Sequence, residues 1–206
     1  MFANFFGKHQ KLPHCDEIFL KYFDQWYDDD SRKRKLFKET RPDLMQAPSV
    51  IDIISNHENF FEDEFQVKYR EHVALIFDSL KKDFPTFLSV KGEPDIAWVK
   101  TFDKFFDRKK INELLVASDP VDFSNKYLVI TCQFGALLGY VMKMNTPRLI
   151  WFYEQPYWES MLCDPKTGYI IPPFHFAIKK MSEYGVDDDF VAKLNCLVNT
   201  LENENS

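Results

Sequence analysis

The chain has 206 residues, of which 45% are hydrophobic, 17% aromatic and 28% charged. This composition excludes a disordered chain, because the apolar side chains are sufficient for a core and the charged fraction is ordinary. The formal net charge is -6, whereas affinity for nucleic acid comes largely from neutralising phosphates, so we expect no nucleic-acid partner.

Residues 1–14 are predicted to form an arm, and residues 15–118 a mainly helical part. The spacing of the aromatic residues predicts a first helix over residues 15–27. A mixed-charge loop is expected from residue 28 to 48. Its basic run RKRK, at residues 32–35, follows three aspartates and one serine, which favours a solvated loop over a localisation or phosphate-binding patch.

The clearest helix is predicted over residues 60–84, where apolar residues recur at steps of three and four. We expect Pro85 to end this helix, since the residue before a proline avoids the helical conformation. Two shorter helices are predicted next, one from Ile96 to about Asp107 and one over residues 111–116.

The segment from Tyr127 to Met142 has sixteen residues without a charge, so it is either a membrane span or a helix buried in protein. A span needs about 20 apolar residues, and lysines bracket fewer here, so we predict a buried helix and no membrane partner. Gly135 and Gly139 lie on one face of it. Each costs roughly 1 kcal/mol of helix propensity, so another element, most simply a sheet, must pack closely against them.

A small antiparallel sheet is predicted after this helix. Its extended runs are RLIWFYEQ (148–155), YWESMLC (157–163) and YIIPPFHF (169–176), and DPKTG (164–168) forms a turn. One helix is expected to close at Gly185, and a last one to cover residues 187–201. We therefore expect a single α+β domain over residues 1–206, in which residues 119–203 supply the glycine-bearing buried helix, the sheet packed on it and the C-terminal helices.

The sequence contains no nucleophile, phosphate-binding or metal-binding motif. Its four cysteines form no CxxC pair, so we predict no metal site and no cofactor. They are typical of a reducing compartment, and the N-terminal residues lack the pattern of a secretory signal. We therefore expect a cytoplasmic protein.

Three residues are candidates for catalysis. Glu154 and Glu159 are carboxylates of the kind that hydrolyses glycosides when they flank a cleft. His175 is the only histidine of the aromatic C-terminal region, with a structural imidazole as the alternative.

Tyrosine and tryptophan are common at interfaces, because they carry an apolar body and a polar tip. We therefore predict that the stretch after the first strand is an exposed turn that binds a protein partner rather than a catalytic site. The alternative is that its aromatic residues belong to the core. The predicted partner-binding residues are Tyr153, Glu154, Tyr157, Trp158 and Glu159.

The segment from Phe134 to Gly185 resembles a pattern in small uncharacterised bacterial proteins. In these proteins a glycine-bearing helix precedes a strand with tryptophan, a hairpin, and a Pro-Phe run that leads to a lysine-bearing helix. Several such families look like immunity proteins, which are encoded beside secreted antibacterial toxins. The resemblance implies a cytoplasmic protein that binds and neutralises a cognate toxin. An enzyme of another family and a homodimeric structural or regulatory protein are the alternatives.

Overall fold

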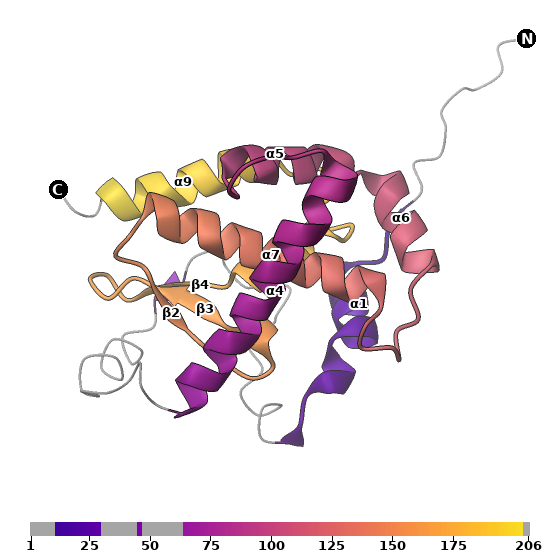
Figure 1. Ribbon diagram of the computed structural model, residues 1–206, viewed down its shortest axis with the longest axis horizontal. Helices are drawn as coiled ribbons and strands as arrows, with labels where there is room; N and C mark the ends of the chain where they lie inside the picture. Colours follow the sequence, from indigo (N-terminus) through magenta and orange to yellow (C-terminus); the bar gives the residue numbers. More distant parts are fainter. Residues whose placement is uncertain (1–10, 30–44, 47–63, 204–206) are drawn as a thin grey trace, which may run out of the picture.

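The computed structural model of the chain describes residues 11–29, 45–46 and 64–203 (Figure 1). The basic run at residues 32–35, most of the predicted loop, the first ten residues of the arm and the predicted helix start at residue 60 lie outside the described residues. The described part has helices at both ends and a small antiparallel sheet, so the predicted α+β class is confirmed.

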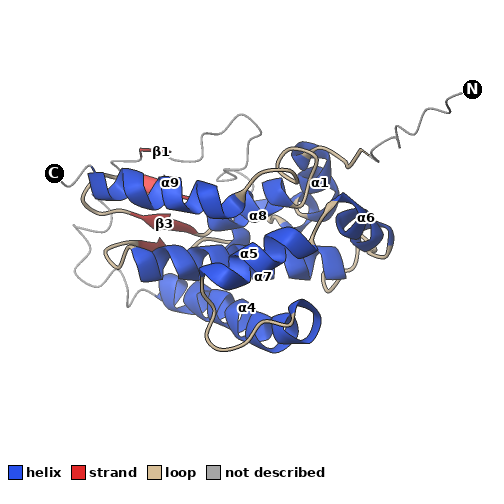
Figure 2. Cartoon of the chain, turned by 90° about the horizontal axis from the view of Figure 1, so that it is seen from above, coloured by secondary structure: helices blue, strands red, loops and turns tan. Residues whose placement is uncertain are grey.

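Helices make up most of the described chain. In chain order they are α1 (Cys15–Tyr22), the 3-10 turn η1 (Asp24–Trp26), α4 (Glu64–Leu88), α5 (Ile96–Phe105), α6 (Arg108–Val116), α7 (Lys126–Asn145), the 3-10 turn η3 (Tyr157–Glu159), α8 (Pro173–Lys180) and α9 (Phe190–Asn203). The central helix is α7, which lies between α4 on one side and α8 with the sheet on the other (Figures 1 and 2). Both α5 and α9 pack along α7 as well.

The sheet has the strand order β1-β4-β3-β2, and every described pair is antiparallel. Its strands are β1 (Met45–Gln46), β2 (Ile150–Phe152), β3 (Met161–Cys163) and β4 (Tyr169–Ile171). In register, Trp151 faces Leu162 and Cys163 faces Ile170. The predicted turn between β3 and β4 is confirmed. Gly168 takes a φ of 73° there, which only glycine adopts without strain, and the carboxylate of Asp164 accepts hydrogen bonds inside the turn.

The apolar helix α7 is buried in the protein, as predicted. Within the described chain it is the one helix long and apolar enough to cross a membrane, but 72% of its most apolar stretch is buried against other elements. Both glycines are explained by close neighbours. A Cβ at Gly135 would lie 2.8 Å from the Cα of Phe174 in α8, and one at Gly139 would overlap the ring of Trp151 in β2.

Two predicted boundaries near prolines are wrong. Helix α4 continues through Pro85 to Leu88, because Phe84 and Leu88 on either side of the proline are buried in the core. This burial outweighs the backbone hydrogen bond that proline cannot make. The predicted extended run also ends at Ile171, since Pro173 starts α8 at the first helical position, where its fixed φ suits a helix.

Other boundaries are shorter than predicted. The first helix ends at Tyr22 and gives way to η1, and β2 covers three residues of the predicted eight. Helix α8 ends at Lys180 rather than near Gly185. A Cβ at Gly185 would lie 2.8 Å from the backbone oxygen of Lys179, so the chain turns tightly back on the helix end at this point.

Candidate functional site

The segment predicted to be an exposed turn lies against the core instead. Trp158 is 1% exposed, Glu159 3% and Tyr157 9%, while Tyr153 and Glu154 are half-buried. The ring of Trp158 packs edge-on against Phe23, with centroids 5.4 Å apart. The prediction that these aromatic side chains project from the sheet is therefore wrong, and the alternative of a core position for Trp158 is correct.

Two of the three candidate catalytic residues meet in a buried polar network. The indole Nε1 of Trp158 donates to the Tyr27 hydroxyl over 3.1 Å, and this hydroxyl donates to the Glu159 carboxylate. The other carboxylate oxygen of Glu159 lies 3.2 Å from Nε2 of His175. Burial, followed by the negative charge of Glu159, raises the pKa of Tyr27 far above its ordinary value.

The side chains of this network connect η1, η3 and α8 in the interior of the protein. Each of its side chains is at most 5% exposed, and neither Glu159 nor His175 lines any of the four cavities described below. Buried polar groups in folded proteins are generally paired in this way, so the geometry fits a structural role. Glu154 lies outside the network, and its backbone N–H donates to Ser160.

An aromatic hollow of about 220 Å³ lies over the same segment. Its wall includes Trp26 and Phe123, whose rings meet edge-on at 4.9 Å, and Phe123 lies 6.3 Å from the Trp158 ring beneath it. Trp158 and Tyr157 thus line the hollow although both are almost buried. The hollow is lined by Trp26, Lys68, Tyr69, His72, Phe123, Gln155, Pro156, Tyr157 and Trp158.

The loop between α6 and α7 presents Phe123 to solvent. Phe123 is 48% exposed and Val121 71%, and the loop carries Asp119 and Asp122 without any basic residue. Each aspartate accepts a hydrogen bond from the backbone N–H two residues later, over 3.1 Å for Asp119 and 2.8 Å for Asp122. Hydrogen bonds from Ser124 lower the pKa of Asp122, so its carboxylate is charged at neutral pH.

The loop is also fixed at both of its ends. Asn125 accepts from the N–H of Leu128 and so caps α7. The side chain of Gln25 donates to the backbone oxygen of Pro120, which ties the loop to η1. The exposed apolar groups are therefore held on a rigid frame.

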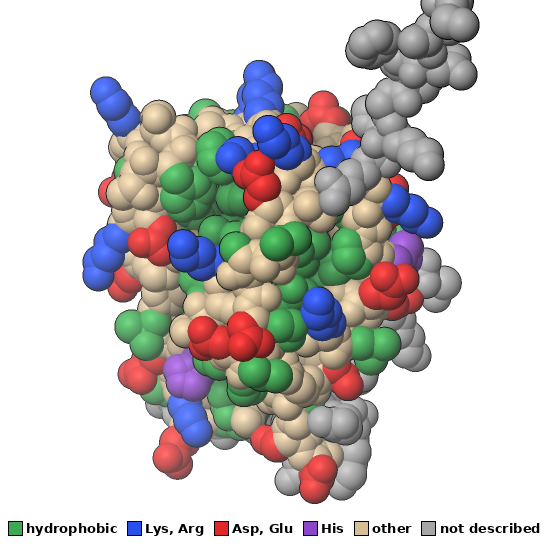
Figure 3. All heavy atoms as spheres, turned by 90° about the vertical axis from the view of Figure 1, so that its right-hand side faces the viewer, with side chains coloured by type: hydrophobic (Ala, Val, Ile, Leu, Met, Phe, Trp, Pro, Cys, Tyr) green, Lys and Arg blue, Asp and Glu red, His purple; other side chains and the backbone are tan. Residues whose placement is uncertain are grey.

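We name this surface the acidic aromatic face and define it by Trp26, Asp28, Asp119, Val121, Asp122 and Phe123. Asp28 belongs to it because its carboxylate accepts from Gln155 at the edge of the hollow, over 3.0 Å. Figure 3 shows the side of the molecule on which α1, α6 and the loop before α7 lie, with hydrophobic side chains exposed between charged ones.

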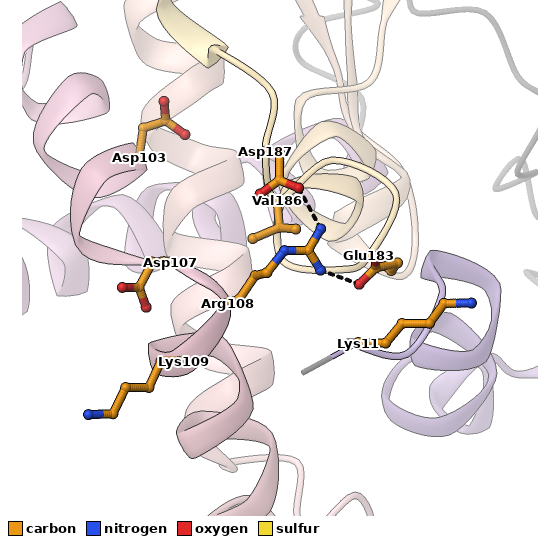
Figure 4. Close-up of a pocket in the computed structure, with 8 residues that line it drawn as sticks. All are labelled: Lys11, Asp103, Asp107, Arg108, Lys109, Glu183, Val186 and Asp187. Atoms are coloured by element: carbon orange, nitrogen blue, oxygen red, sulfur yellow. Dashed lines mark hydrogen bonds and ion pairs between the residues drawn. The ribbon is translucent and has the colours of Figure 1, made fainter. Parts of the chain in front are cut away.

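A larger charged cleft, about 900 Å³, lies between α6 and the loop after α8 (Figure 4). Arg108 forms ion pairs with Glu183 and Asp187 there, and Glu183 also accepts from the backbone N–H of Leu12. The other charged side chains of the cleft point away from Arg108 in Figure 4. They do not converge on one point, so the cleft has the geometry of a structural clamp that holds the N-terminal segment to α6 and α8.

The remaining predicted residue, Tyr153, lies apart from the aromatic hollow. It lines an apolar groove between α4, α7 and β2, together with Trp151. Phe123, Val121 and Trp26 were not predicted as binding residues. The signal for the first two is the short stretch DPVDF, in which two apolar residues alternate with aspartates inside a turn-rich segment.

Comparison of the chain with protein-family models, curated proteins and solved structures finds no match.

Proposed function

We propose that the chain is a cytoplasmic protein of immunity type, which binds and neutralises a cognate toxin through the acidic aromatic face. The observation that supports this proposal is the exposure of Phe123. Among the phenylalanines that the structure describes, it is the one that is exposed rather than buried or half-buried. An aromatic ring on a rigid loop loses little conformational freedom when a partner covers it.

The charge around Phe123 indicates what kind of partner the face fits. Asp28, Asp119 and Asp122 are all exposed at this surface. Complementary charge speeds the encounter of two proteins and selects between partners. The face therefore suits a protein with a basic surface that also offers an apolar group or pocket for the ring. The four free cysteines agree with a reducing compartment such as the cytoplasm.

The test uses the protein encoded beside the gene for this chain. We would measure its affinity for the purified chain, and bacterial growth when both are expressed together. Phe123→Ala should weaken binding at least about tenfold and abolish protection, because central aromatic anchors carry much of the binding energy. Asp122→Asn should mainly slow association and reduce its dependence on salt.

Tyr184→Ala is the matched control. Tyr184 is 43% exposed, close to the 48% of Phe123, but it does not line the aromatic hollow. Its removal should leave affinity and protection unchanged. The proposal is wrong if no neighbouring gene product binds the chain, or if Phe123→Ala binds as tightly as the wild type.

A further inference from the structure

The apolar groove between α4, α7 and β2 has a volume of about 310 Å³, within the range of small-molecule sites. Val73 and Phe77 of α4 line it together with Tyr140 of α7, and Trp151 and Tyr153 close the groove on the side of the sheet. It shares no lining residue with the aromatic hollow, so the two are separate cavities.

Two pairs of stacked rings give the groove flat walls. Phe77 and Tyr140 lie 4.5 Å apart at an interplanar angle of 29°, and Trp151 and Tyr153 lie 5.8 Å apart at 13°. Gly139 makes the second pair possible, because the Trp151 ring lies against the α7 backbone where any side chain would collide with it. The costly glycine in the middle of α7 therefore shapes this groove.

Positive charge is concentrated at the groove. Arg70 and Lys143 line both the groove and an adjoining hollow of about 190 Å³, and among the residues that the structure describes no carboxylate lines either cavity. This is unusual for a chain with a net charge of -6. Within the described residues Arg70 forms no ion pair, and Lys143 donates to the backbone oxygen of Leu149 rather than to an acid.

Arg70, Lys143 and Tyr153 all line the adjoining hollow, so the two cations and the Tyr153 phenol lie at the same end of the groove. Burial raises the pKa of the Tyr153 phenol to about 12, and the nearby charge of Arg70 opposes this rise. An apolar cavity with cations at its edge is complementary to a molecule that is apolar over most of its length and negatively charged at one end.

We infer that the apolar groove binds a small hydrophobic carboxylate, with its apolar body between the aromatic walls and its carboxylate on Arg70 and Lys143. The volume sets the size of the body. A cavity of about 150 Å³ holds one benzene ring, so about twice that volume fits two fused rings or an aliphatic chain of similar bulk. Met144, 62% exposed at the groove, is flexible enough to adapt to either shape.

The test compares three ligands that share one two-ring body. Naphthoate, naphthalenemethanol and naphthylmethylammonium would be titrated into the full chain by calorimetry, with the melting temperature recorded for every variant. Naphthoate should bind, and the neutral alcohol and the cation should bind at least about tenfold more weakly, because a charge-assisted hydrogen bond is lost.

Single substitutions show whether naphthoate binds in the groove. Arg70→Gln and Lys143→Gln should each weaken naphthoate about tenfold, and Ala74→Trp should abolish binding by filling the groove from its exposed edge. Lys82→Gln removes a charge from an exposed position of the same helix outside the groove and should change nothing.

Three results would overturn the inference. The first is no binding of naphthoate up to its solubility limit, and the second is equal affinity for the alcohol. The third is unchanged affinity in a folded Ala74→Trp variant, which would place the ligand elsewhere. Phe123→Ala, which acts on the separate hollow, should leave naphthoate affinity unchanged, so this test stands apart from that of the proposed function.

Discussion

Replacing Trp158 by alanine separates a structural role from a binding role for the segment before β3. The ring is 1% exposed, so almost all of its surface is removed from water on folding. Truncating a buried aromatic residue costs about 3 to 5 kcal/mol. Tyr27 loses the hydrogen bond that it accepts from the indole but keeps its own bond to Glu159, so no buried carboxylate is left unpaired.

The expected loss is a large fraction of the total stability of a protein, which is about 5 to 15 kcal/mol. For a chain of this length, each kcal/mol shifts the melting temperature by about 2 to 4 °C. Trp158→Ala should therefore melt roughly 6 to 20 °C below the wild type in calorimetry or circular dichroism.

Phe123→Ala is the comparison, because its ring is half exposed and meets Trp26 edge-on at 4.9 Å, while its other ring neighbour, Trp158, is further away at 6.3 Å. Loss of that ring pair costs about 0.5 to 1.5 kcal/mol, so its melting temperature should fall by no more than about 6 °C. The reasoning is refuted if Trp158→Ala melts within a degree or two of the wild type, since the ring would then not be part of the core.

Three further predictions concern packing, pH and thiol chemistry. Gly135→Ala should lower the melting temperature although alanine favours helices, because the alanine Cβ would lie 2.8 Å from the Cα of Phe174 and force α7 and α8 apart. An equal or higher melting temperature would contradict this packing. Arg108 holds the pKa of Glu183 below its ordinary value of 4.5, so the clamp contributes stability above that pH and loses it as the pH falls through the lowered pKa. The difference in melting temperature between the wild type and Glu183→Gln should therefore be largest near neutral pH and shrink below about pH 4.5. A difference that stays constant with pH would exclude the carboxylate as its cause. In the native protein an aromatic disulfide reagent should titrate one thiol rapidly, that of the exposed Cys196, since the other three cysteines are buried; Cys196→Ser should then show no rapid phase.

The sequence predicts those parts of the fold that depend on residues close to one another along the chain. The buried helix α7 follows from a long stretch without charges, and the turn at residues 164–168 follows from its proline and glycine. The burial of Trp158 does not follow from its neighbours in sequence. It depends on Phe23 and Tyr27, more than 130 residues away, and no local pattern reports that contact.

The same reason explains why the acidic aromatic face was missed. Phe123 and Val121 come from the loop before α7, whereas Trp26 comes from η1. Each fragment alone is an ordinary short loop or turn. Only the packing of η1 against the loop, through Gln25 and Pro120, brings the exposed groups together.

The many aromatic residues between positions 151 and 158 do not form one exposed binding turn, as the sequence favoured. Trp151 and Tyr153 line the apolar groove, while Tyr157 and Trp158 line the aromatic hollow. Helix α4 divides in the same way, since Val73 and Phe77 line the groove while Tyr69 and His72 line the hollow. The two cavities therefore share their supporting elements but no lining residue.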